Sequence, residues 1–183
     1  MRALVVNLCK EKLHYYEFVK PIEDILKGEG VSFFTKGYLE IGEKDLPGAD
    51  RVILCGTSLK DFDYLNNLDK FDWLKNFVKP ILGICAGMEI IGLIFDGEKA
   101  KKLEIGYFKE CFEKDFLGLS GDVEVYHLHR SYVDFSSIKN FELYCSGDGI
   151  AQAVKSINRP IYGVLFHPEV RNKQVIVNFA NEK

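Results

Sequence analysis

The segment 80–95 constrains the fold of this chain more than any other stretch. It begins with an apolar run, passes through Cys85, Ala86 and Gly87, and continues into the apolar residues 88–95. This order is typical of a buried strand, a sharp turn and a helix, because small residues let the backbone bend between the two elements. A cysteine on such a turn lies at a helix N-terminus, where the pKa of a thiol is lowered. The segment therefore predicts a nucleophile; a buried structural cysteine is the alternative.

A second apolar run, 160–166, ends at a histidine and a carboxylate, His167 and Glu169. A histidine can take the proton of a thiol, and a carboxylate can hold the imidazole in one tautomer and stabilise its charged form. A strand end followed by a turn is the simpler interpretation, but it leaves the segment 80–95 unexplained. Together the two segments predict a catalytic site made of Cys85, His167 and Glu169.

Short apolar runs alternate with helical patterns through the first half of the chain. We expect strands at 2–8, 31–35, 51–54 and 80–84, and helices at 15–27, 71–77 and 88–95. Pro21 requires that the regular part of the first helix begin near it. Apolar strands joined by helices are typical of an α/β fold with a mostly parallel sheet covered on both faces. Ligands bind at the carboxyl ends of such strands, where Cys85 and His167 would lie.

The pattern changes after residue 95. The residues 99–102 form a charged cluster that we expect to be solvated. Polar and apolar residues then alternate, which predicts an added antiparallel hairpin region at 105–133, 141–146 and 150–155. A strand at 161–166 and a helix at 173–180 close the fold. The length of 183 residues predicts one domain, 1–183.

Composition narrows the class of protein. A hydrophobic content of 47% with 28% charged residues is ordinary for a soluble globular protein. The net charge of −3 and the absence of a basic block argue against a nucleic-acid partner, and no apolar run is long enough for a membrane span. The five cysteines are scattered and odd in number, so we expect a reducing cytoplasm rather than a disulfide framework. No cofactor is expected.

Two motifs resemble those of the class I glutamine amidotransferases, a family with a Cys-His-Glu triad. The elbow of that family reads G-x-C-x-G-x-Q and is matched by 83–89 except at Glu89; its second signature, F-H-P-E, is present at 166–169. The resemblance spans nearly the whole chain. It implies a flavodoxin-like open mixed sheet and hydrolysis of the glutamine side-chain amide through a cysteinyl thioester on Cys85.

The resemblance also implies where an oxyanion is stabilised. The backbone N–H of Ala86 is one expected donor, at the start of the helix. The second donor of the family lies in an S-G-G-P loop, which here reads Cys-Gly-Thr-Ser at 55–58. Gly56 is therefore the second expected donor, and Thr57 is an expected substrate contact. Threonine does not reach the backbone angles open to glycine, so the loop is expected to be less ready for catalysis.

A third patch of the family, S-H-x-D, corresponds here to Leu-His-Arg-Ser at 128–131. In the family, backbone groups of this patch hold the substrate α-carboxylate, so His129, Arg130 and Ser131 are expected substrate contacts. His127 and His129 alternate on one strand face and form a possible pair of metal ligands. No third ligand is suggested nearby, so we expect no metal.

Glu89 is the most informative departure from the family. The glutamine of the family at this position fixes the α-carboxylate of free glutamine, whereas an ionised glutamate repels it unless it is protonated or paired. The γ-glutamyl hydrolases, which share the fold, resemble the sequence better at this position. A solvated or ion-paired helix residue is the structural alternative.

Three functions therefore stay open. The first is a free-standing glutaminase subunit, which is an amidotransferase that delivers ammonia to a separate synthetase and depends on that partner for activity. The second is a γ-glutamyl hydrolase or peptidase. The third is an amidotransferase-like binding module with weakened catalysis. The intact Cys85, His167 and Glu169 favour an enzyme, whose substrate is glutamine or a γ-glutamyl compound.

Overall fold

The computed structural model describes residues 1–42 and 44–182. Within these ranges, nine strands form one sheet in the order β2-β1-β3-β4-β9-β8-β7-β5-β6. The strands β2, β1, β3, β4 and β9 run parallel to their neighbours in this group, and the remaining strands pair antiparallel. This is the predicted α/β, flavodoxin-like mixed sheet with an added antiparallel region.

The parallel strands are short, and all of them except the edge strand β2 are central in the sheet. Their bounds are Arg2–Asn7 for β1, Ser32–Gly37 for β2, Arg51–Leu54 for β3, Ile81–Ile84 for β4 and Ile161–Val164 for β9. Every residue of β3, β4 and β9 is buried, because helices cover both faces of this part of the sheet. The carboxyl ends of β4 and β9 are therefore neighbours at one edge of the sheet, with Ile84 paired to Val164.

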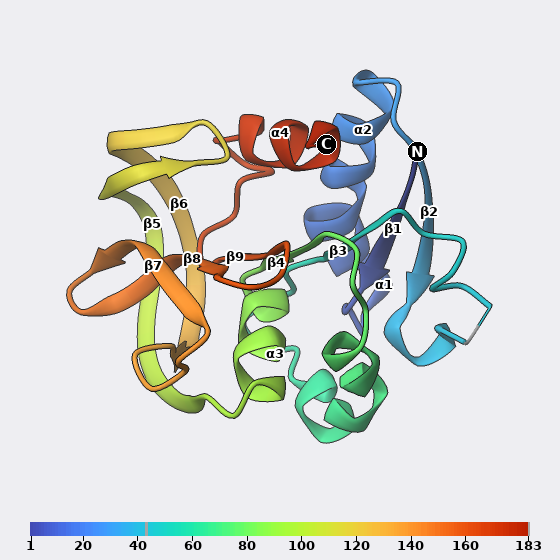
Figure 1. Cartoon of the computed structure of the whole chain (residues 1–183), viewed down its shortest axis with the longest axis horizontal. Coiled ribbons are helices and arrows are strands. Elements are labelled where there is room, and N and C mark those ends of the chain that lie inside the picture. The colour runs from blue at the N-terminus through green and yellow to red at the C-terminus, as the bar shows by residue number, and fades with distance from the viewer. Residues whose placement is uncertain (43, 183) are drawn as a thin grey trace.

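Helices lie on both faces of the parallel strands (Figure 1). On one face α2, Lys20–Gly28, contacts α4, Gln174–Asn181. On the other face α3, Ala86–Ile94, contacts a 3₁₀ segment at Asp63–Lys75. Each pair buries its own apolar cluster against the sheet. None of the helices in the described ranges is long and apolar enough to cross a membrane.

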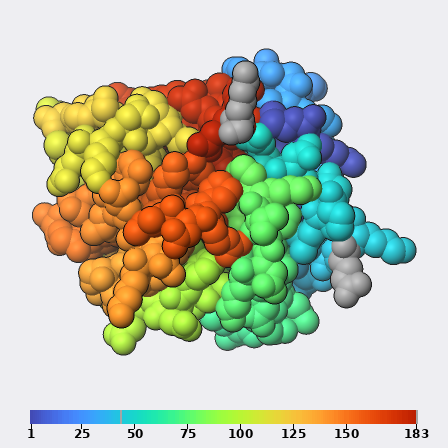
Figure 2. Space-filling model, viewed as in Figure 1, coloured from blue at the N-terminus to red at the C-terminus, as the bar shows by residue number. Residues whose placement is uncertain are grey.

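The antiparallel region is built on two long strands, β5 at Glu98–Phe116 and β6 at Leu119–Asp134. Two shorter strands, β7 at Phe141–Gly147 and β8 at Ile150–Ser156, connect this hairpin to β9. In Figure 2 the hairpin region (yellow and orange) occupies one side of the molecule, and the N-terminal segments (blue and cyan) occupy the other.

Three elements differ from the expectations. The charged residues 99–102 belong to the start of β5; Lys99 and Lys101 are exposed there, but Lys99 and Lys102 also form ion pairs with buried carboxylates. The first helix is α1 at Lys12–His14, a π-helical segment at Tyr15–Val19 and then α2, so the regular part does begin beside Pro21. The segment expected as a helix at 71–77 ends a longer 3₁₀ segment.

Candidate active site

Cys85 lies on the turn between β4 and α3, in a strained backbone conformation. Its φ of 49° and ψ of −104° are unusual for a residue with a side chain, and such a conformation costs on the order of 1–3 kcal/mol. Two hydrogen bonds hold it: the N–H of Cys85 donates to the carbonyl of Val164 at 2.8 Å, and its carbonyl accepts from the N–H of Glu89 at 3.0 Å. Strained residues concentrate at functional sites, where the surrounding structure keeps them in place.

The glycines of the elbow allow α3 to approach the sheet closely. A Cβ at Gly87 would lie 2.3 Å from the carbonyl oxygen of Leu54 on β3, and a Cβ at Gly83 would lie 2.6 Å from Ile91 Cδ1. No real side chain tolerates such distances, so larger residues would push α3 away from the strands. The G-x-C-x-G spacing thus has a packing reason as well as a conformational one.

His167 and Glu169 follow β9 and are paired with each other. The Nδ1 atom of His167 lies 2.7 Å from Glu169 Oε1, and both side chains are buried. The N–H of His167 donates to the carbonyl of Tyr126 on β6 at 2.8 Å, and its ring packs against Phe18 in the π-helical segment. This arrangement directs Nδ1 to the carboxylate and leaves Nε2 without a hydrogen bond to any described residue.

Gly56 brings the cysteine and the histidine into one site. A Cβ at Gly56 would lie 2.6 Å from His167 Cε1 and 3.5 Å from Cys85 Cβ. Burial opposes a charge on His167, but the carboxylate of Glu169 and the adjacent Cys85 together outweigh it and raise the pKa of His167 well above its usual value. The structure therefore brings together the three residues expected to be catalytic, with an imidazole that readily accepts a proton.

The two expected oxyanion donors flank Cys85. Ala86 is the first residue of α3, where a helix leaves its N–H groups without intrahelical partners. Gly56 follows β3, and a Cβ there would lie 3.5 Å from Cys85 Cβ. Both residues are therefore neighbours of Cys85, and their role as oxyanion donors stays a prediction.

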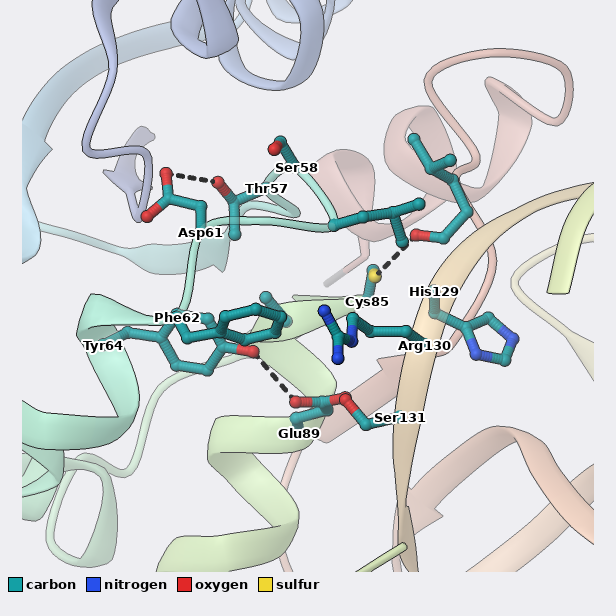
Figure 3. Close-up of a pocket in the computed structure, with 13 residues that line it drawn as sticks. Thr57, Ser58, Asp61, Phe62, Tyr64, Cys85, Glu89, His129, Arg130 and Ser131 are labelled. Carbon is teal, nitrogen blue, oxygen red and sulfur yellow. Dashed lines mark hydrogen bonds between the residues drawn. The ribbon is translucent and has the colours of Figure 1, made fainter. Parts of the chain in front are cut away.

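A small pocket opens beside Cys85 (Figure 3). Its lining includes all five expected substrate contacts, which come from the loop after β3, from α3 and from β6: Thr57, Glu89, His129, Arg130 and Ser131. The thiol of Cys85 faces the carbonyl of Leu128 on β6 at 3.6 Å. The guanidinium of Arg130 lies over the ring of Phe62, 5.0 Å from its centroid, and is exposed. Arg130 therefore places a positive charge at the pocket, as recognition of a carboxylate requires.

Thr57 and His129 take other roles than their position in the sequence suggests. The hydroxyl of Thr57 donates to Asp61 Oδ2 at 3.0 Å, so the side chain fixes its own loop. The ring of His129 points away from Cys85, on the far side of β6 (Figure 3). It contacts His127 and Glu104 instead, with His129 Nε2 at 3.0 Å from His127 Nδ1 and at 2.9 Å from Glu104 Oε2. The premise that the histidine pair lacks a third ligand is therefore wrong.

Glu89 lines the pocket but is not a free negative charge. Its carboxylate is buried and accepts hydrogen bonds from Tyr64 at 2.9 Å, from Ser131 at 2.6 Å and from Lys99 at 2.7 Å. An unpaired carboxylate in this position would cost several kcal/mol, which explains the number of partners. The ion-paired alternative for Glu89 is the one that the structure contains, and Lys99 neutralises the expected repulsion.

Sequence reasoning missed three residues that shape this site: Tyr64, Lys99 and Phe18. Lys99 belongs to a run of lysines that resembles any solvated surface, and only the contact of its ammonium with the buried Glu89 distinguishes it. Tyr64 belongs to the 3₁₀ segment, which has no clear apolar period. Phe18 is part of an apolar helix face in the sequence, but its contact with His167 depends on the tertiary structure.

Comparisons with known proteins identify the family of this chain. The family model of glutamine amidotransferase class-I matches residues 34–179. One subunit of the glutamine-hydrolyzing GMP synthase of Methanosarcina barkeri is 30% identical over 168 residues, which cover 87% of this chain and 77% of the relative. The corresponding subunit of Thermoplasma acidophilum is 32% identical over 144 residues, covering 74% of this chain and 70% of the relative.

Solved structures give the same result for the fold. The crystal structure of a putative GMP synthase subunit from Thermoplasma acidophilum superposes with a TM-score of 0.85 at 24% identity, covering 98% of this chain and 92% of that one. A glutamine amidotransferase from Thermotoga maritima superposes with a TM-score of 0.73 at 20% identity, covering 95% of this chain and 78% of that one.

Proposed function

Because the chain belongs to the class I glutamine amidotransferase family, we propose that Cys85, His167 and Glu169 hydrolyse the side-chain amide of glutamine through a cysteinyl thioester. One observation carries the assignment: a strained cysteine at a helix N-terminus shares Gly56 as a neighbour with a histidine that is bonded to a buried carboxylate. A nucleophile, a base and a group that orients the base are the minimum that covalent acyl transfer needs.

The steps follow from the orientation of the imidazole. Glu169 holds Nδ1–H, so Nε2 takes the thiol proton as Cys85 Sγ attacks the amide carbon. The N–H groups of Gly56 and Ala86 stabilise the oxyanion. His167 returns the proton to the leaving nitrogen, ammonia departs and a thioester remains. Water then attacks the thioester, gives a proton through His167 to the thiolate of Cys85, and glutamate is released.

The substrate amino acid fits the pocket lining. Arg130 supplies the charge complement for the α-carboxylate, together with backbone groups of the 128–131 stretch. Lys99 balances the charge of Glu89, so this carboxylate does not repel the α-carboxylate of glutamine. In this assignment Ser131 and Tyr64 are positioning residues, since their hydroxyls hold the Glu89 carboxylate.

We infer that the ammonia passes to a separate synthetase subunit in the cytoplasm, and that the chain acts as a single amidotransferase domain. The support comes from the relatives, whose names identify them as subunits of a glutamine-hydrolyzing GMP synthase. The five thiols are free, which agrees with a reducing compartment. Partner binding would complete the altered loop at Thr57, as conformational closure does in many such systems.

The γ-glutamyl hydrolase alternative is based on the resemblance at Glu89. Because Glu89 is paired with Lys99, its charge no longer argues against free glutamine as the substrate. A module without catalysis has no use for the strained Cys85 and the His167–Glu169 pair. Glutamine hydrolysis is therefore the function that the site supports best.

Ammonia release from glutamine tests the proposal, measured for the isolated protein and with the synthetase subunit of the same cell added. We expect slow release alone and strong stimulation by the synthetase. A glutamine-like electrophile should label Cys85 before the exposed Cys111, as peptide mass spectrometry would record. Equal labelling of both cysteines, or cleavage of γ-glutamyl anilides but not of glutamine, would overturn the assignment.

A further inference from the structure

A cluster of polar side chains lies on the inward face of the β5–β6 hairpin, apart from the catalytic groups. It consists of His127 and His129 on β6 and of Glu104 and Glu110 on β5. All four side chains are buried, and the ring of His127 is fully so. Buried histidines and carboxylates require partners. Yet Glu104 Oε2, His127 Nε2 and His129 Nδ1 make no hydrogen bond within the described part of the chain.

Three possible ligand atoms of this cluster lie close to one another. His127 Nδ1 and His129 Nε2 lie 3.0 Å apart, and Glu104 Oε2 lies 3.3 Å from the first and 2.9 Å from the second. Ligands that bind zinc tetrahedrally at about 2.0–2.1 Å lie roughly 3.3 Å from one another. The triangle of donor atoms therefore has nearly the size that a bound divalent ion would give it.

Neighbouring groups prepare the donors for a metal. The other nitrogen of His127, Nε2, lies 3.3 Å from Glu110 Oε1, which is where a carboxylate orients a metal-binding histidine. The ring of His129 is buried and lies between His127 and Glu104. Lys102 Nζ lies 2.9 Å from the other carboxylate oxygen of Glu104, Oε1.

We propose that Glu104, His127 and His129 bind a divalent transition-metal ion, zinc above all, with Glu110 as the group that orients His127. Two histidines and one carboxylate are a ligand set that zinc accepts, whereas magnesium and calcium prefer oxygen ligands alone. The ion bridges β5 and β6, since the register pairs Glu104 with His129.

Strand β6 links the proposed metal site to the catalytic groups. On β6 the metal-binding side chains alternate with the two carbonyls that face the catalytic residues. The carbonyl of Tyr126 accepts the N–H of His167, and that of Leu128 faces the thiol of Cys85. A metal ion between the hairpin strands holds this part of β6 in place. In Figure 3 the ring of His129, one of the proposed ligands, lies on the side of β6 away from Cys85.

The test uses a Cys85→Ser background, because Cys85 and His167 are themselves possible zinc ligands. Isothermal titration with zinc should give one equivalent bound. His127→Ala, His129→Asn and Glu104→Gln in that background should each abolish binding or weaken it at least ~100-fold, and Glu110→Gln should weaken it about 10–100-fold. His14→Gln, a histidine outside the cluster, is the matched control and should bind normally.

Cobalt substitution reports on the donor atoms independently of folding losses in the variants. The Cys85→Ser protein, which keeps the other four cysteines, is loaded with cobalt. Cobalt in the proposed site should give visible d–d bands without the near-ultraviolet charge-transfer band of a thiolate ligand. Circular dichroism of each variant checks that it folds. The proposal is overturned by no binding to the folded Cys85→Ser protein, by binding that survives in folded His127 and Glu104 variants, or by a thiolate charge-transfer band.

Discussion

The two halves of the sheet place functional groups in different ways. In the parallel half, Cys85 and His167 follow the carboxyl ends of neighbouring strands, and backbone hydrogen bonds hold them. In the hairpin half, Lys99 and Ser131 project from within long strands and interact through side chains, chiefly with Glu89. Reactive groups are thus positioned by the backbone, and the charge of the pocket is set by side-chain pairs that cross between the halves.

This difference predicts different sensitivities. A group positioned by strand ends and close backbone approach should lose function through small displacements, since misplacement of about 1 Å can cost 10²-fold in rate. A group held in a network of side chains should respond mainly to changes of charge. The following predictions test that contrast, beginning with the largest effect.

Glu169→Gln should lower kcat for glutamine hydrolysis about 10²–10⁴-fold, because the imidazole loses the group that sets its tautomer. It should also lower the pKa of His167, since the carboxylate that raises it is gone. NMR titration of the His167 ring in both proteins measures the change. An unchanged pKa would contradict the role given to Glu169 and would weaken the assignment of the parallel half as catalytic.

The same pair predicts how stability depends on pH. The pKa of His167 in the folded state lies above that of an unfolded histidine, which is about 6.5. Protonation therefore stabilises the fold below that pH, and this contribution is lost as the pH rises through the folded value. The wild type should therefore have its largest advantage over Glu169→Gln in the free energy of unfolding at about pH 6.5. The advantage should decrease as the pH rises toward the pKa of His167 in the folded protein, and denaturant titrations at several pH values measure this difference.

Gly56→Ala should lower kcat about 10²-fold, because the added methyl would lie 2.6 Å from His167 Cε1 and must move the ring. Gly28→Ala is the matched control, since a Cβ there meets no atom within 4 Å. Steady-state kinetics with the synthetase present compare the two. Equal activity of both variants would mean that catalysis tolerates a displaced His167 ring, and that the parallel half is not the more sensitive one.

Lys99→Met should raise KM for glutamine roughly tenfold or more, with a smaller effect on kcat. The Glu89 carboxylate loses its balancing charge and then repels the α-carboxylate of glutamine. Two like charges about 5 Å apart repel by about 3 kcal/mol at an effective dielectric of 20. The double variant Lys99→Met/Glu89→Gln should recover much of the lost affinity. If the double variant binds glutamine no better than the single one, Lys99 acts through packing rather than through charge.

Lys75→Ala should have the smallest effect, with no measurable change in the free energy of unfolding. Lys75 pairs with Asp72 at 2.9 Å, but both side chains are more than half exposed. Thermal denaturation of this variant beside Lys99→Met compares an exposed pair with a pair whose carboxylate is buried. A larger loss for Lys75→Ala than for Lys99→Met would reverse the expected order.

Local patterns in the sequence were enough for the framework of the parallel half. The apolar runs identified its strands, and the elbow and the F-H-P-E motif marked Cys85, His167 and Glu169 as the catalytic candidates. These features depend on neighbours in the chain, because strand period, turn residues and helix starts are local properties.

The partners of side chains in the hairpin half were decided by the tertiary structure alone. The sequence contained Lys99 and Glu104 among ordinary charged residues, and it held no sign that one would neutralise Glu89 or that the other would meet the histidine pair. Those contacts depend on the register of β5 against β6 and on the approach of β6 to α3. They join residues that are 10 to 42 positions apart in the sequence. A shift of one residue in that register would turn each of these side chains to the opposite face.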